Sequence, residues 1–221
     1  MTKSISSASP RFWNERYASG QTPWLVDSVP AALRSFLKRT KTRGAVLVPG
    51  CGTDHLVLQT FQTAGFDVTA IDFSKVAVAR TKNALGHFEG EIVLGDFFTF
   101  DFGKRFDLIY ERTFLCALHP RRWRRYAARV AELLRSRAIL AGIFLYGEEP
   151  DPPPYPLSKS TAAEIFGKYF RLVHHVKISD SVPMFAGMES WQEWQRASHG
   201  ERQGSGQKIS RTGSKISAKR R

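Results

Sequence analysis

Short apolar segments alternate with amphipathic segments along the middle of the chain, and this alternation restricts the possible folds more than any other feature. Five apolar segments are predicted strands, at residues 45–49, 67–72, 91–94, 106–110 and 138–146. Helical patterns lie between most of them, at residues 56–64, 75–85 and 121–134. Strands that are apolar throughout and alternate with helices are typical of a parallel sheet covered on both faces. The sequence therefore predicts an α/β fold.

Further elements are predicted on both sides of this alternation. Helical patterns at residues 10–18 and 30–39 precede the first strand, and we expect both helices to cover the ligand site. A helix at residues 160–168 is followed by two closing strands, at 170–178 and 190–195, which are expected to form an antiparallel pair. The prediction is a mostly parallel sheet of seven strands with helices on both faces.

Positive charge is unevenly distributed along the 221 residues, whose formal net charge is +13. Nearly half of this excess lies in residues 200–221, where seven Lys and Arg accompany a single Glu. This segment is rich in Gly and Ser and has no aromatic residue, so it cannot bury enough surface to offset its ordering entropy. We expect a basic disordered tail at residues 200–221 and one domain at residues 1–199.

A second group of basic residues lies in the predicted helix at residues 121–134, whose apolar residues recur three and four positions apart. This pattern favours a solvent-exposed arginine face. The tail and this helix nevertheless leave an alternative open, in which the protein binds or modifies nucleic acid.

Several classes of protein are disfavoured by composition. The longest apolar stretch, at about residues 138–146, is far shorter than the roughly 20 residues of a membrane-spanning helix. The first residues lack the apolar core of a secretory signal. Two cysteines and no CxxC motif predict neither a disulfide framework nor a metal site. A cytoplasmic protein is the expectation.

Glycines and carboxylates stand where three predicted strands end. The glycines of the turn at residues 50–52 let the backbone approach a ligand closely. Asp72 ends the second strand, where its carboxylate suits the two hydroxyls of a ribose or, alternatively, only begins the next helix. Asp96 ends the third strand and suits an adenine amino group, with Phe97 beside the ring. Bulky His55 at the third glycine position of GxGxxG disfavours a dinucleotide. Three strand ends that carry Gly-x-Gly, Asp and Asp in this order suit an adenosine with an unphosphorylated tail, which is the shape of S-adenosylmethionine.

The order of these motifs resembles the thiopurine S-methyltransferase superfamily, which includes bacterial thiopurine enzymes and plant thiol and halide methyltransferases. The resemblance covers residues 11–197 and is most specific at residues 106–126. The strings that carry it are FWNERYASGQTPW, VLVPGCGTDH, VTAIDFS, GDFF, FDLIYERTFLCALHPRRWRRYA and PPPYPLS. It implies a Rossmann-like class I methyltransferase that uses S-adenosylmethionine to methylate a small soft nucleophile, namely a thiol, a thiopurine, or a halide or chalcogen anion.

The resemblance also implies roles for individual residues. Arg112 would face the acceptor, or alternatively form a salt bridge with Glu111 or Asp107. Phe12, Trp13 and Tyr155 are candidate walls of the acceptor pocket. The residues that would contact the cofactor are Trp24, Gly50, Cys51, Gly52, Asp72, Phe73, Asp96, Phe97 and the backbone of Glu111.

Methyl transfer to a soft anion needs alignment more than proton transfer, so no acid or base is assigned. Cys116, within FLCAL, is interpreted as a packed thiol rather than a nucleophile. The string DPPPY at residues 151–155 is similar to the DPPY motif of nucleic-acid amino-methyltransferases. That motif follows the fourth strand, whereas these prolines follow the fifth, so a stiff loop beside the substrate pocket is the preferred interpretation.

Two positions depart from the family pattern. Residues 136–138 read SRA where relatives commonly have Pro-Gly-Gly, which predicts a less well formed turn before the fifth strand. Asp54 occupies a place often given to glycine. The acceptor and the oligomeric state do not follow from the sequence, and a monomer with a small-molecule acceptor is the default expectation.

Overall fold

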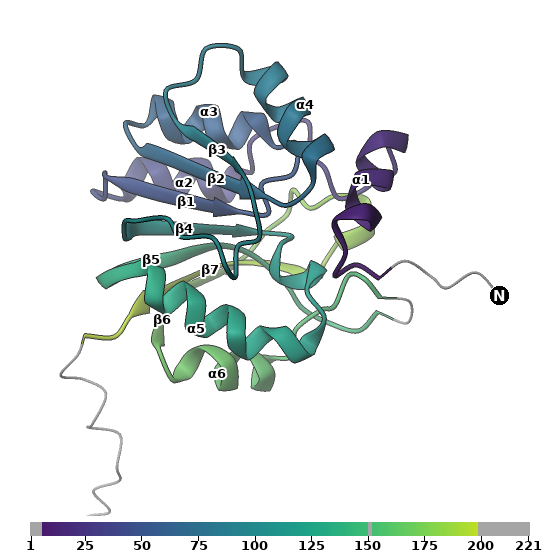
Figure 1. The fold of residues 1–221 in the computed structure, drawn as a ribbon. Helices are drawn as coiled ribbons and strands as arrows, with labels where there is room; N and C mark the ends of the chain where they lie inside the picture. The colour runs from purple at the N-terminus through teal and green to yellow at the C-terminus, as the bar shows by residue number, and fades with distance from the viewer. Residues whose placement is uncertain (1–5, 150–151, 199–221) are drawn as a thin grey trace, which may run out of the picture.

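A computed structural model describes residues 6–149 and 152–198, which form a mixed sheet with helices on both faces (Figure 1). Its seven strands run in the order β3-β2-β1-β4-β5-β7-β6. The strands are β1 (Ala45–Pro49), β2 (Asp67–Asp72), β3 (Glu91–Leu94), β4 (Phe106–Arg112), β5 (Leu134–Leu145), β6 (Phe170–Lys177) and β7 (Glu189–Arg196). The first five are parallel, whereas β7 is antiparallel to both β5 and β6. The predicted mostly parallel sheet and its antiparallel closing pair are confirmed.

Two apolar clusters hold the helices on opposite faces of the sheet. The α-helices are α1 (Pro10–Ser19), α2 (Ala31–Arg39), α3 (His55–Thr63), α4 (Lys75–Leu85), α5 (Trp123–Leu133) and α6 (Lys159–Gly167). Short 3-10 turns are η1 (Leu115–Ala117), η2 (Pro120–Arg122) and η3 (Pro183–Phe185). One cluster joins α5 and α6 to the sheet, and the other joins α2, α3 and α4 to its opposite face. The central strands β1, β2 and β4 are therefore buried on both sides, as their apolar sequences predict.

The two N-terminal helices differ in position, in contrast to the expectation that both cover the site. Leu33 and Phe36 of α2 are buried in the same cluster as Trp191 of β7, so α2 covers a face of the sheet. Helix α1 packs against α4 and lies beyond the carboxyl ends of the strands (Figure 1). Only α1 stands over the edge at which ligands of parallel sheets bind.

The junction between α5 and β5 differs from its prediction. The helix ends at Leu133 and β5 begins at Leu134, four residues before the predicted strand. Phe106 pairs with Leu134 but Leu108 pairs with Ile139, so the chain bulges between these two pairs. Within the bulge Arg137 has a φ of 62°, in the left-handed region that glycine occupies most easily. The backbone of the SRA sequence is thus strained at Arg137, and a glycine at this position would relieve the strain.

Strand β4 also extends beyond its predicted end, so Glu111 and Arg112 are its last two residues rather than the start of a loop. In residues 6–149 and 152–198, no helix is long and apolar enough to cross a membrane. The predicted basic tail at residues 200–221 lies outside the described residues.

Candidate active site

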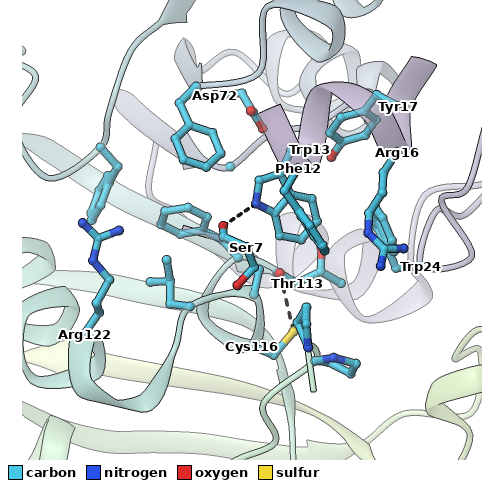
Figure 2. A pocket seen from close by; sticks show the side chains of 18 of the residues that line it. Ser7, Phe12, Trp13, Arg16, Tyr17, Trp24, Asp72, Thr113, Cys116 and Arg122 are labelled. Carbon is cyan, nitrogen blue, oxygen red and sulfur yellow. Dashed lines mark hydrogen bonds between the residues drawn. The ribbon is translucent and has the colours of Figure 1, made fainter. Parts of the chain in front are cut away.

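A large cavity opens at the carboxyl ends of the parallel strands, with α1 as one wall (Figure 2). Its empty volume is about 1080 Å³, including the part open to solvent. Apolar and aromatic side chains make up most of its surface, as is usual for small-molecule sites. Of the residues expected at the site, those that line it are Phe12, Trp13, Trp24, Gly50, Asp72, Phe73, Asp96 and Phe97.

The turn after β1 brings backbone to the cavity without side chains. Gly50 and Gly52 have φ values of 59° and 52°, which few other residues adopt. A Cβ on Gly50 would collide with the Phe114 ring, and one on Gly52 would lie 2.5 Å from the Tyr17 hydroxyl. Gly50 lines the large cavity, whereas Cys51 and Gly52 line a smaller adjoining one. Space at this turn thus depends on both glycines.

Asp72 ends β2 beside this turn and faces the cavity (Figure 2). Its Oδ2 accepts a hydrogen bond from Gly52 N–H at 2.9 Å, and its Oδ1 accepts one from Ser74 N–H at 2.8 Å. A carboxylate offers about four lone-pair positions, so each oxygen can accept one further bond from a ligand. Burial raises the pKa of Asp72 to about 6, against the lowering effect of these backbone donors. Asp72 therefore both organises the turn and retains capacity for hydroxyl donors.

Asp96 and Phe97 form the wall of the cavity after β3. The Asp96 Oδ1 accepts a hydrogen bond from Phe98 N–H at 2.9 Å, which holds the turn. Phe97 is buried and makes an edge-to-face contact with Phe114 at 5.4 Å between ring centroids. This wall offers a carboxylate beside a flat apolar surface, which suits a purine ring.

An aromatic cluster on α1 and the loop after it forms the opposite wall. Trp24 makes edge-to-face contacts with Trp13 and Tyr17, at 5.6 and 6.2 Å between centroids. Asn14 fixes the helix to α4, because its Oδ1 accepts a hydrogen bond from the Ser74 hydroxyl at 2.8 Å. The helix is thus a fixed wall and not a loose N-terminal extension.

Arg112 does not line the large cavity, in contrast to its expected position facing the acceptor. Its side chain is buried below the Trp24 loop, where Nη2 donates to the Trp24 carbonyl at 3.0 Å. Its Nη1 lies 3.7 Å from Oδ2 of Asp54, a partner other than the expected Glu111 or Asp107. Burial raises the pKa of Asp54, and Arg112 opposes this rise. Arg112 therefore supports the loop that carries Trp24.

The side chain of Glu111 lies beneath the cavity rather than in it. Its Oε1 accepts hydrogen bonds from Phe114 N–H at 3.0 Å and Leu115 N–H at 2.8 Å, and its Oε2 accepts one from the Tyr126 hydroxyl at 2.6 Å. Burial raises the pKa of Glu111 to about 7 despite these three donors. Glu111 thus shapes the segment after β4, which forms the floor of the cavity.

Tyr155 is also absent from the cavity wall, where Pro153 and Pro154 stand instead. The Tyr155 N–H donates to the Cys116 carbonyl at 2.7 Å, which holds the proline-rich loop against the cavity floor. This agrees with a loop that borders the pocket. Cys116 lines the cavity, but burial raises the pKa of its thiol, so it stays protonated at neutral pH. Its interpretation as a packed thiol agrees with this burial.

Other cavity residues were not foreseen from the sequence. They come from α1, from the segment after β4 and from the η2 and η3 turns, and they include Arg16, Tyr17, Thr113, Phe114, Leu118, Arg122, Met184 and Phe185. The amphipathic pattern of α1 predicts a helix but does not indicate which side faces a ligand. Across residues 6–149 and 152–198, no group of His, Cys, Asp or Glu is arranged to hold a metal ion.

Solved structures with the same fold include methyltransferases with S-adenosylhomocysteine bound. The N-methyltransferase NodS from Bradyrhizobium japonicum superposes with a TM-score of 0.70 at 16% identity, covering 86% of this chain and 99% of its own. The 1,6-didemethyltoxoflavin-N1-methyltransferase of Burkholderia thailandensis gives 0.68 at 20% identity, covering 86% and 87%. The glycine turn and the strand-end carboxylates also fit an adenosine. The fold and the site therefore define a class I methyltransferase whose cofactor is S-adenosylmethionine.

Sequence comparison defines the family within this class. A sequence model described as thiopurine S-methyltransferase matches residues 8–197, so the chain belongs to the thiopurine S-methyltransferase family. A probable thiol methyltransferase 2 of Arabidopsis thaliana is 29% identical over 202 residues, covering 88% of each chain. A thiopurine S-methyltransferase of Vibrio campbellii is 29% identical over 178 residues, covering 72% of this chain and 82% of the relative. The protein is an enzyme that methylates small molecules.

Proposed function

We propose that this enzyme transfers a methyl group from S-adenosylmethionine to a small soft nucleophile, namely a thiol, a thiopurine, or a halide or chalcogen anion. The observation that carries this proposal is the chemistry of the cavity, which combines adenosine-binding groups with aromatic and apolar walls. Soft anions are well accommodated by such walls. The names of the relatives, which act on thiols, thiocyanate and thiopurines, support the same acceptor class.

In this proposal the cofactor lies along the carboxyl ends of β1, β2 and β3. The Asp72 carboxylate would accept hydrogen bonds from the ribose hydroxyls, and Asp96 with Phe97 would hold the adenine. Gly50 and Trp24 would border the methionine part. When bound, the cofactor supplies an electrophilic methyl group on a sulfonium sulfur.

The remaining half of the cavity would hold the acceptor. Its proposed lining is Phe12 and Trp13 from α1, Thr113 from the segment after β4, and Pro153 and Pro154 from the proline-rich loop, all of which line the cavity. These residues would exclude water from the nucleophile and orient it. Aligning two reactants can account for about 7–11 kcal/mol of a barrier. A thiolate is already nucleophilic, so its methylation needs no general base.

The cellular context belongs to the proposal as well. We place the enzyme in the cytoplasm as a monomer that acts on a dissolved acceptor. The fold and the relatives lend no support to the alternative of a nucleic-acid partner, which rests on the charge of residues 200–221 and of α5.

A screen of acceptors tests this function. Purified enzyme is incubated with S-adenosylmethionine and thiophenol, 6-mercaptopurine, iodide, selenite or tellurite, and methylated products are detected by mass spectrometry. We expect methylation of at least one soft nucleophile, and its loss in Asp72→Ala. Methylation of oligonucleotides by the wild-type enzyme, with none of any soft nucleophile, would refute the proposal.

A further inference from the structure

Arginine side chains reach the large cavity from two different elements. Arg16 comes from α1 and Arg122 from η2, and Figure 2 shows them on opposite sides of the cavity. Both guanidinium groups stack on phenylalanine rings: Arg16 lies 4.4 Å from the centroid of Phe12, and Arg122 lies 4.6 Å from that of Phe98. Each side chain is thereby held at the cavity wall.

Arg16 has no anionic partner within the described part of the chain. No carboxylate of residues 6–149 or 152–198 forms an ion pair with it, although Arg11 on the same helix pairs with Glu15 at 2.7 Å. A guanidinium at a partly enclosed, largely apolar wall interacts more strongly with an anion than one in bulk water. The free charge of Arg16 is therefore available to a ligand.

The contacts of Arg112 and Arg122 distinguish these two arginines from Arg16. Arg112 lines the smaller adjoining cavity, where Asp54 and the Trp24 carbonyl already engage its guanidinium. Arg122 stacks on Phe98, next to the Asp96–Phe97 wall that we assign to adenine. Arg16 is thus the cavity-lining cation on the helix that carries the proposed acceptor walls Phe12 and Trp13.

We infer that Arg16 binds an anionic substituent of the acceptor, and that the preferred substrates are ring-bearing thiols that carry a carboxylate or a similar anionic group. This inference rests on the proposed function, because it assigns the acceptor half of the same cavity. The aromatic walls would hold the ring while the guanidinium donates two parallel hydrogen bonds to the carboxylate. The thiolate would remain free to face the methyl group.

The test compares two thiols that differ mainly in charge, 4-mercaptobenzoate and 4-methylbenzenethiol. For Arg16→Gln, we expect kcat/KM for 4-mercaptobenzoate to fall by about tenfold or more, the effect of losing a charge-assisted hydrogen bond. The value for 4-methylbenzenethiol should stay within about twofold of the wild type. Arg16→Lys should give an intermediate loss, because a lysine keeps the charge without the planar fork.

The matched control is Arg11→Gln, which removes the same charge from an exposed position of the same helix outside the cavity wall. This substitution should leave kcat/KM for both thiols unchanged. Affinity for S-adenosylhomocysteine, measured by calorimetry, should be unchanged in Arg16→Gln.

Three results would separate the possibilities. Weaker binding of S-adenosylhomocysteine by Arg16→Gln would assign Arg16 to the cofactor and overturn the inference. An equal loss for both thiols with unchanged cofactor binding would also overturn it, because the substituent would then play no part. Failure of the wild-type enzyme to methylate either thiol, or any other soft nucleophile, would instead refute the proposed function itself.

Discussion

At the scale of single residues, the Asp72 carboxylate combines a structural role with the ligand-binding role that we propose for it. Its oxygens already accept hydrogen bonds from Gly52 and Ser74, and both remain able to accept more. Burial makes the charged form costly, since the pKa rises to about 6. A hydroxyl donor would stabilise the charged form, so cofactor binding and ionisation of Asp72 should be coupled.

This coupling predicts the pH dependence of cofactor affinity. The affinity of the wild-type enzyme for S-adenosylhomocysteine should be constant above pH 7 and fall as pH drops below about 6, by up to about tenfold per pH unit. Asp72→Asn should bind at least about tenfold more weakly at pH 7.5 and lose this dependence. Calorimetry from pH 5 to 8 measures both effects. Asp67→Asn, at the exposed first position of the same strand, serves as the control. An unchanged affinity in Asp72→Asn would contradict the assignment.

Glu111 illustrates the cost of burying a carboxylate. In the folded state the Glu111 carboxyl keeps its proton up to about pH 7. In the unfolded chain it loses this proton near its ordinary pKa of 4.5. Between these values the folded state binds more protons, so the free energy of unfolding should fall as pH rises. The decrease due to Glu111 should reach about 3 kcal/mol and level off above pH 7.

Glu111→Gln should remove this contribution, because the amide does not ionise and its oxygen can still accept from Phe114 or Leu115. Urea unfolding at pH 5, 6, 7 and 8 should therefore show that the variant loses less stability than the wild type across this range. Glu111→Ala also lacks the ionisable group but leaves buried donors without an acceptor, so its deficit relative to the wild type, about 3 kcal/mol at pH 5, should shrink as pH rises towards 8. Parallel profiles for the wild type and Glu111→Gln would count against the raised pKa.

At the scale of elements, the junction between α5 and β5 contains backbone strain that a substitution could remove. Arg137 is exposed and has a φ of 62°, which costs a residue with a Cβ about 1 kcal/mol or more relative to glycine. Arg137→Gly should therefore raise the free energy of unfolding by about 1 kcal/mol. The neighbouring Ser136 is also exposed but has no positive φ, so Ser136→Gly should be neutral or destabilising in the same urea titration. Equal effects of the two substitutions would show that this conformation is not strained.

The same elements show what local sequence can predict. The bounds of β1, β2, α4 and β3 match their predictions, because apolar runs and helical periodicity are local signals. The start of β5 was missed because a bulge depends on pairing with β4, which lies far away in the sequence. The orientation of the Arg112 side chain is not predictable for a similar reason. The Trp24 carbonyl, which accepts its hydrogen bond, is 88 positions away in the sequence. The positions of Gly50 and Asp72 at the cavity edge are predictable, because both residues lie at the carboxyl ends of strands.

At the scale of the whole molecule, the net charge of +13 divides between the methyltransferase domain and residues 200–221. If the function is confined to the cavity at the sheet edge, this segment contributes little to catalysis. Deletion of residues 200–221 should leave kcat/KM for thiols and affinity for S-adenosylhomocysteine within about twofold, since exposed charges contribute little across a Debye length. A loss of thiol methylation on deletion, or nucleic-acid affinity that depends on this segment and falls steeply with salt, would favour the alternative partner.

In the proposed mechanism, S-adenosylmethionine lies at the sheet edge, the acceptor lies against the aromatic wall, and no residue acts as an acid or base. This mechanism has one chemical requirement: the acceptor must be nucleophilic before it enters. The most direct test uses S-adenosylmethionine with a deuterated methyl group and two acceptors of the same shape, 4-mercaptobenzoate and 4-hydroxybenzoate. The labelled methyl group should appear on sulfur with one S-adenosylhomocysteine formed per product, and transfer to the phenol oxygen should be at least about a hundredfold slower, because no general base supports it. Comparable methylation of the phenol, or no transfer to sulfur from an enzyme that binds the cofactor, would contradict this mechanism.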